Sequence, residues 1–127
     1  MLNTERIPGL HSEGGWDVPE RLNMARQCLR RPDKQVALIE LTGSDACNST
    51  YGQLTQMTDD LARTLLHRVQ PGDRVGVLLS QSPWCAAAHL AIWKIGAISV
   101  PLFKLFKQDA LRSRVGDAGA KIVLTDA

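Results

Sequence analysis

The feature that most constrains the fold is a series of apolar segments between residues 74 and 125 that alternate with helical patterns. Residues 74–79 (RVGVLL) are nearly all apolar and lack the polar alternation of a strand that is exposed on one face. A strand of this kind is covered on both faces, as in a parallel sheet. Helices and further strands are expected in turn at residues 84–95, 97–103, 108–118 and 121–125. The order strand, helix, strand, helix, strand, with short connections, predicts a parallel βαβαβ unit with right-handed crossovers.

The residues before this unit predict smaller elements. A helix is expected over about residues 20–30, with Leu22, Ala25 and Leu29 at helical spacing on its inner face, and Pro32 ends it. Two strands, at residues 35–41 and 48–51, are expected to form a hairpin around a turn at residues 43–45. Residues 1–19 are rich in Gly and Pro and predict an irregular N-terminal arm, which Trp16 would dock onto the domain.

A long helix is expected to begin at residue 50, because Thr50 and Gln53 match the capping-box pattern. Asp59 and Arg63 are expected to form an ion pair on this helix. Its buried stripe is predicted to consist of Leu54, Met57, Leu61, Ala62, Leu65 and Leu66. The fold class expected is therefore α/β: a Rossmann-like parallel βαβαβ sheet with helices on both faces, preceded by a helix, a β-hairpin and a long helix.

The composition is that of one globular domain. The chain has 127 residues, of which 44% are hydrophobic and 22% charged, and this excludes disordered and collagen-like proteins. The net charge of +2 gives no support for a nucleic-acid or anionic-membrane partner. Cys28, Cys47 and Cys85 lack CxxC spacing, so reduced thiols packed in the interior are expected, not disulfides or metal ligands. Neither a signal peptide nor a membrane span is recognised, and a cytoplasmic location is expected.

The most informative positions for ligand binding are the predicted strand ends, because an open parallel sheet binds ligands beyond the carboxyl ends of its strands. These ends fall at residues 80–82, 103–105 and 125–126. Ser82 is expected to cap the helix that follows, and a phosphate contact by the same turn is the less favoured alternative. Neither GxGxxG nor GxxxxGK[ST] occurs in the chain.

Other polar side chains are interpreted conservatively. His89 has no carboxylate or second ligand beside it in the sequence, so a hydrogen-bonded core histidine is favoured over a base or a metal ligand. Four basic residues lie close together in the sequence: Lys104, Lys107, Arg112 and Arg114. They form either a solvated face or a group that attracts a phosphorylated ligand. The sequence predicts no catalytic residue and no metal site.

Seven short motifs carry a family resemblance. They are LNMA (22–25), RPD (31–33), TYGQL (50–54), PGDRV (71–75), IWKIGA (92–97), VPL (100–102) and AKIV (120–123). Their order and spacing resemble the N-terminal part of the AMP-forming acyl-CoA synthetases, a superfamily that also contains luciferases and adenylation domains. Residues 90–103 are most similar to the branch of acetyl-CoA and medium-chain acyl-CoA synthetases. The resemblance runs from about Leu22 to the last residue.

The resemblance implies a reaction in which ATP activates a carboxylate to an acyl-adenylate, with release of pyrophosphate, before the acyl group passes to CoA. Mg²⁺ would neutralise the phosphates. The family's phosphate loop, adenosine-binding Asp and catalytic Lys have no counterpart here. Residues 20–127 are therefore expected to be the N-terminal subdomain of an AMP-binding domain, truncated before the phosphate-binding loop and inactive alone. Its expected partners are the remaining synthetase domains, and self-association through exposed apolar surface is a further expectation.

The resemblance also implies one binding site. Phe103 and Lys104 would line the CoA channel, because in CoA-bound relatives the segment after this strand does so. Some members have glycines after the aromatic residue, and Lys104-Leu105 departs from that pattern. The alternative function is a free-standing Rossmann-like interaction or nucleotide-sensing module. Such a module would lack the exposed apolar patch that missing domains leave on an enzyme portion.

Overall fold

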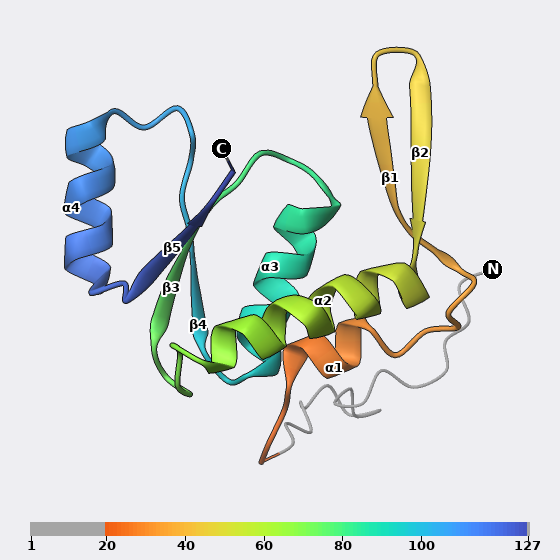
Figure 1. Cartoon of the computed structure of the whole chain (residues 1–127), viewed down its shortest axis with the longest axis horizontal. Coiled ribbons are helices and arrows are strands. Elements are labelled where there is room, and N and C mark those ends of the chain that lie inside the picture. The colour runs from red at the N-terminus through yellow and green to blue at the C-terminus, as the bar shows by residue number, and fades with distance from the viewer. Residues whose placement is uncertain (1–19, 127) are drawn as a thin grey trace, which may run out of the picture.

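The structure is a computed structural model that describes residues 20–126 (Figure 1). Its main body is a parallel three-stranded sheet with the order β4-β3-β5. The strands are β3 (Arg74–Leu78), β4 (Ile98–Pro101) and β5 (Ile122–Thr125). Two helices connect them, α3 (Pro83–Lys94) and α4 (Gln108–Ala118), and these lie on opposite sides of the sheet. The predicted βαβαβ unit and the α/β fold class are confirmed.

The central strand β3 is covered on both faces, as its apolar sequence predicts. Val75 and Val77 are buried on one face, and Gly76 is buried on the other. Gly76 leaves just enough room for its neighbours, because a Cβ atom there would lie 3.1 Å from Leu102 Cδ1 and 3.1 Å from Val123 Cγ2. The side chains of Leu102 and Val123 can therefore pack over the centre of β3.

A hairpin and a long helix precede the sheet. The antiparallel strands β1 (Val36–Thr42) and β2 (Asp45–Thr50) join through a turn in which Gly43 has a φ of 64°. Helix α2 (Tyr51–Leu66) follows directly. Its predicted capping box is present: the Gln53 N–H donates to Thr50 Oγ1 at 3.3 Å, and the Thr50 N–H donates to Gln53 Oε1 at 2.9 Å.

Helix α3 is the centre of the molecule, which explains why its sequence is apolar nearly all round. It packs against the sheet, α2 and α1 (Met24–Cys28). One apolar cluster joins α3, α2 and β3, and its largest wholly buried side chains are Ile92 and Val75. A second cluster joins α3 to α1 and α2, and it consists of Ala25, Leu54, Ala87 and Leu90.

The first helix is shorter than the predicted span of residues 20–30. It starts after Asn23, whose Oδ1 accepts a hydrogen bond from the Arg26 N–H at 3.1 Å. The same side chain donates through Nδ2 to Trp93 O at 3.1 Å, so it also attaches α1 to the end of α3. Leu22, which the prediction placed on the inner face, is 59% exposed because it precedes this cap.

Two details predicted for α2 are wrong. Leu66 is exposed, and Thr58 is buried in the stripe instead, because positions 54, 58, 62 and 65 follow the helical period more closely. Arg63 pairs with Asp60 at 2.9 Å and not with Asp59, which pairs with Lys94 of α3. A contact from a neighbouring helix thus outcompetes the local one.

The cysteines are free, as expected, but the prediction that they pack in the interior is correct only for Cys85. Cys28 and Cys47 are exposed, since they lie on a one-turn helix and on a hairpin with little covering it. The predicted N-terminal arm and Trp16 lie outside the described residues. Within residues 20–126, no helix combines the length and the apolar character needed to cross a membrane.

Candidate functional site

Three side chains, one from each strand of the parallel sheet, meet at its carboxyl edge. Ser80 follows β3, Lys104 follows β4 and Asp126 follows β5. The Lys104 ammonium forms an ion pair with Asp126 and donates a hydrogen bond to Ser80 Oγ at 2.9 Å. The Ser80 N–H donates to Asp126 Oδ2 at 3.1 Å. The three strand ends, which the sequence indicates as positions for ligand binding, thus lie together, and the ion pair that joins them was not predicted.

The Asp126 carboxyl group of this strand-end cluster is ionised at neutral pH. The hydrogen bond from Lys104 holds the pKa of Asp126 far below its usual range, and hydrogen bonds from Ser80 act in the same direction. The Lys104 side chain nevertheless remains 45% exposed. An ammonium group has three donors, so Lys104 keeps a donor for an incoming anion while it holds its two partners.

A cavity of about 420 Å³ opens beside the cluster. Phe103 and Lys104 both line it, so the two predicted site residues share one cavity. Its other walls are mostly apolar and come from the ends of β3 and β4 and the start of α3: Val77, Leu79, Ser80, Gln81, Cys85, His89, Pro101, Leu102 and Leu105. The phenyl ring of Phe103 meets that of Phe106 edge-on, with centroids 5.7 Å apart, which stabilises the position of this loop. The arrangement suits a ligand with a slender apolar part and an anionic part.

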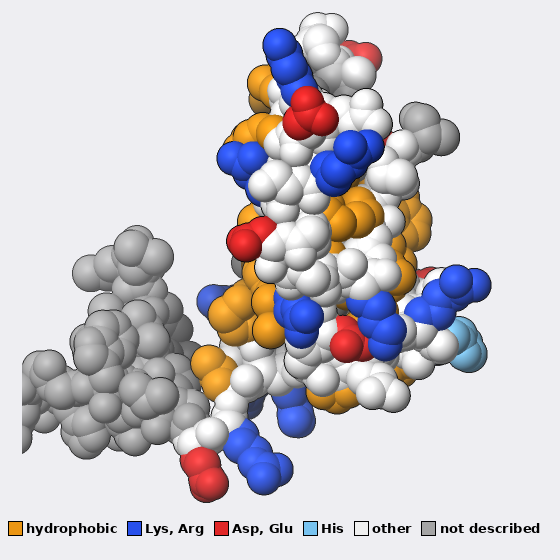
Figure 2. All heavy atoms as spheres, turned by 90° about the vertical axis from the view of Figure 1, so that its left-hand side faces the viewer, with side chains coloured by type: hydrophobic (Ala, Val, Ile, Leu, Met, Phe, Trp, Pro, Cys, Tyr) orange, Lys and Arg blue, Asp and Glu red, His pale blue; other side chains and the backbone are white. Residues whose placement is uncertain are grey.

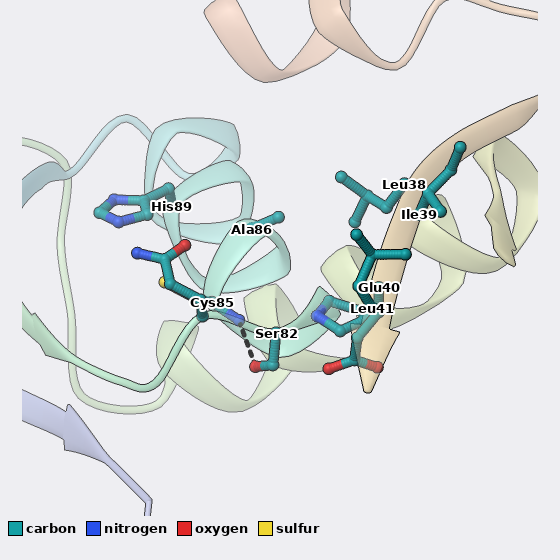
Figure 3. Close-up of a pocket in the computed structure, with 10 residues that line it drawn as sticks. Leu38, Ile39, Glu40, Leu41, Ser82, Cys85, Ala86 and His89 are labelled. Atoms are coloured by element: carbon teal, nitrogen blue, oxygen red, sulfur yellow. Dashed lines mark hydrogen bonds between the residues drawn. The ribbon is translucent and has the colours of Figure 1, made fainter. Parts of the chain in front are cut away.

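A second cavity of about 460 Å³ is a neighbour of the first, and both are lined by Gln81, Cys85 and His89. Figure 3 shows its two sides, with Leu38 to Leu41 of β1 facing the first turns of α3. Ser82 accepts a hydrogen bond from the Cys85 N–H at 3.3 Å and so caps α3 as predicted. Its oxygen is used within the helix, which does not support a phosphate contact there.

His89 differs from its predicted role. It is half-buried, and its ring lies 5.8 Å from that of Trp93. Burial lowers the pKa of His89, so the imidazole is predominantly neutral at neutral pH. The described residues provide no hydrogen bond to its ring, and it lines both cavities, so the expectation of a hydrogen-bonded core histidine is wrong. The one sequence feature that could have indicated a place for His89 in the cavity wall is its position on a helix that follows a strand end.

The predicted basic group does not converge on one point. Lys104 belongs to the strand-end cluster, while the Arg114 guanidinium lies over the Phe106 ring, 4.1 Å from its centroid. Lys107 and Arg112 are exposed. Figure 2 faces α4 and shows Lys and Arg side chains spread among hydrophobic and acidic ones. This favours a solvated face. Residues 20–126 also contain no group of three or more His, Cys, Asp or Glu side chains that could hold a metal ion.

Comparison with known proteins places this geometry in a family. The family model described as "AMP-binding enzyme" matches residues 24–127. Acetyl-coenzyme A synthetase of Penicillium chrysogenum is 35% identical over 122 residues, which are 91% of this chain and 18% of that protein. The human "Acetyl-coenzyme A synthetase 2-like, mitochondrial" is 37% identical over 119 residues, which are 87% of this chain and 17% of that protein.

Solved structures give the same result. A Brucella canis acyl-CoA synthetase has a TM-score of 0.77 and 31% identity, and the match covers 82% of this chain and 20% of that one. The N-terminal subdomain of Klebsiella oxytoca NpsA has a TM-score of 0.70 and 28% identity, over 80% of this chain and 26% of that one. The chain thus spans less than a fifth of the two curated relatives named above. The motif resemblance is confirmed, and the chain belongs to the family of AMP-binding enzymes.

Proposed function

We propose that this chain is the N-terminal scaffold portion of an ATP-dependent, AMP-forming acyl-CoA synthetase. The reaction of such an enzyme converts a carboxylate, ATP and CoA to acyl-CoA, AMP and pyrophosphate. The proposal is supported by the identity to relatives named acetyl-coenzyme A synthetase. The observation that carries it is the cavity at the carboxyl edge of the sheet, where Phe103 and Lys104 lie together.

This cavity would hold part of CoA. Leu79, Leu102 and Phe103 offer an apolar wall to the slender pantetheine chain, and Lys104 offers a cation to a CoA phosphate. When bound, CoA supplies the thiol that accepts the acyl group. Phe103 and Lys104 would bind and orient CoA, and neither side chain would transfer a proton or form a covalent bond.

ATP and Mg²⁺ are a different case. The family chemistry implies both, but the described residues offer no cluster of metal ligands. The sequence also contains no glycine-rich loop that could hold a triphosphate. The residues present do not fit ATP or Mg²⁺. The sheet and helices would therefore have a structural role, and other parts of the enzyme would bind the triphosphate.

The isolated chain is expected to be inactive in ATP–pyrophosphate exchange with acetate or medium-chain acids. Nothing in it would stabilise the charge that develops when a carboxylate attacks the α-phosphate. The measurement is the incorporation of labelled pyrophosphate into ATP, with a complete acetyl-CoA synthetase as the positive control. Exchange above the buffer background that survives repurification would contradict the scaffold role.

In a complete enzyme that carries this segment, Lys104→Glu is expected to raise the KM for CoA about tenfold or more, since a charge-assisted contact is replaced by repulsion. The KM for ATP should change less than twofold. Steady-state kinetics with each substrate varied in turn make the comparison. Lys107→Glu is the control, because it changes the same charge at an exposed side chain that does not line the cavity. Equal increases in both KM values would refute the assignment to CoA.

We further propose residues 20–127 as the subdomain, preceded by an arm at residues 1–19, with the remaining synthetase domains as partners. Exposed apolar side chains support a partner-covered surface, among them Leu105 at 92% and Leu41 at 76% exposure. The same surface would permit self-association of the isolated chain. It weighs against the free-standing module, for which a patch-free surface is expected. Three free cysteines accord with a cytoplasmic location.

A further inference from the structure

Three arginines line one cavity beside α1. Arg21, Arg26 and Arg30 contribute to a polar cavity of about 590 Å³, together with Leu22, Asn23 and Gln27. A neighbouring cavity of about 580 Å³ also contains Arg26 and Arg30 and adds Lys94. No acidic side chain of the described residues lines either cavity. In Figure 1, α1 lies at the end of the molecule away from the carboxyl ends of the parallel strands, so these cavities are separate from the proposed CoA site.

The positive charges of these arginines are not neutralised within residues 20–126. The ion pairs there involve other cations, namely Arg63, Lys94, Lys104 and Lys121. Arg26 lies in α1 and Arg30 follows the C-cap of that helix, and because both line the same two cavities, their like charges repel one another there. A bound anion would remove this repulsion, which gives the cavity a reason to prefer negative ligands.

Helix α1, which carries Arg26, is held in place. Ala25 is wholly buried in the second apolar cluster, against α2 and α3. Asn23 caps α1 and donates to Trp93 O and Lys94 O at 3.1 and 3.2 Å, so the helix is attached to the end of α3. Arg26 therefore projects from a fixed helix, and Arg21 and Arg30 lie on either side of that helix and line the same cavity.

We propose that Arg21, Arg26 and Arg30 form a binding site for a compound that bears two or more linked phosphates. The guanidinium group is planar and binds phosphate oxygens in pairs, which a single ammonium cannot do. The cavity volume falls in the range of small-molecule sites, which favours a compact polyphosphate over an extended acidic polypeptide. The site is independent of the proposed synthetase role, because it uses none of the strand-end residues.

The test is a titration of the 127-residue chain with inorganic triphosphate, free of divalent ions, followed by amide chemical shifts in ¹⁵N–¹H spectra. The expected shifts are confined to residues 21–31 and their neighbours on α3. The double variant R26Q/R30Q should weaken binding about tenfold or more. The matched control is R63Q/R112Q, which removes the same charge from exposed positions outside both cavities and should leave the affinity within twofold. Unchanged amide shifts of Val75 and Val77, which are buried in the central strand of the sheet, would establish that the fold of each variant is intact.

Three outcomes would overturn the proposal. Equal weakening by the two double variants would mean a general attraction of anions to a basic protein. Shifts centred on Ser80 and Lys104 would place the triphosphate at the other end of the molecule. A hexaglutamate peptide that binds the same residues as tightly as triphosphate would assign the surface to an acidic protein partner.

Discussion

Ile92→Ala is expected to lower the free energy of unfolding by about 3–4 kcal/mol, the cost of lost burial plus a cavity. Ile92 is wholly buried in α3, where one apolar cluster brings α2, α3 and β3 together. A domain of this size is stable by only about 5–15 kcal/mol, so the variant would lose a large share of its stability. Urea denaturation followed by circular dichroism gives the difference, provided that both proteins unfold with the same m-value.

Ile98→Ala is the control for this measurement. It deletes the same atoms from a side chain that is 52% exposed at the start of β4, and the expected loss is about 1 kcal/mol or less. Similar losses for the two variants would show that α3 is not the centre of the core. A larger loss for Ile98→Ala would instead place the stabilising contacts at the edge of the sheet.

The parts of this fold that the sequence predicts are those whose cause is local. The near-absence of polar residues in β3 indicates burial on both faces, and Val75, Gly76 and Val77, which alternate between the faces, are all buried. The Thr50 and Gln53 capping box depends on a three-residue spacing and is present. Alternation of strands and helices is also a local pattern, and it leads directly to the parallel sheet.

The predictions that are wrong concern positions where a contact with a residue distant in sequence determines the local structure. Asp59 pairs with Lys94, which is 35 residues away in the sequence, so the expected pair with Arg63 does not form. The start of α1 depends on Asn23, whose amide bonds to carbonyl groups 70 and 71 residues away. No window of sequence around either position contains these partners.

The site shows the same division. The rule for parallel sheets indicated residues 80–82, 103–105 and 125–126 as positions for ligand binding, and Ser80, Lys104 and Asp126 of these segments are in contact. The rule states where strand ends lie but not which side chains are in contact. The sequence therefore did not predict the Lys104–Asp126 ion pair or the contribution of His89 to the cavity. The prediction that Phe103 and Lys104 bind CoA came from the family resemblance, and it stays a prediction.

Gly76→Val is expected to destabilise the domain by about 2–3 kcal/mol through overpacking at the centre of the sheet. A Cβ at this position lies 3.1 Å from carbon atoms of Leu102 and Val123, and the two methyl groups of valine need more room still. The higher strand propensity of valine recovers less than about 1 kcal/mol. Because β3 lies between β4 and β5, relief of the clash would also displace the strands that carry Lys104 and Asp126.

Gly116→Ala is the matched control, since a Cβ there meets no atom within 4 Å and the residue lies inside α4. It should stabilise the protein by about 0.5–1 kcal/mol, because alanine is the better helix former. The Lys104–Asp126 contact provides a second readout. Opening of the strand ends weakens the interaction that lowers the pKa of Asp126, so that pKa should rise in Gly76→Val and stay unchanged in Gly116→Ala. A Gly76→Val protein with wild-type stability and an unshifted carboxyl titration would mean that the sheet does not pack as closely at this glycine as the structure shows.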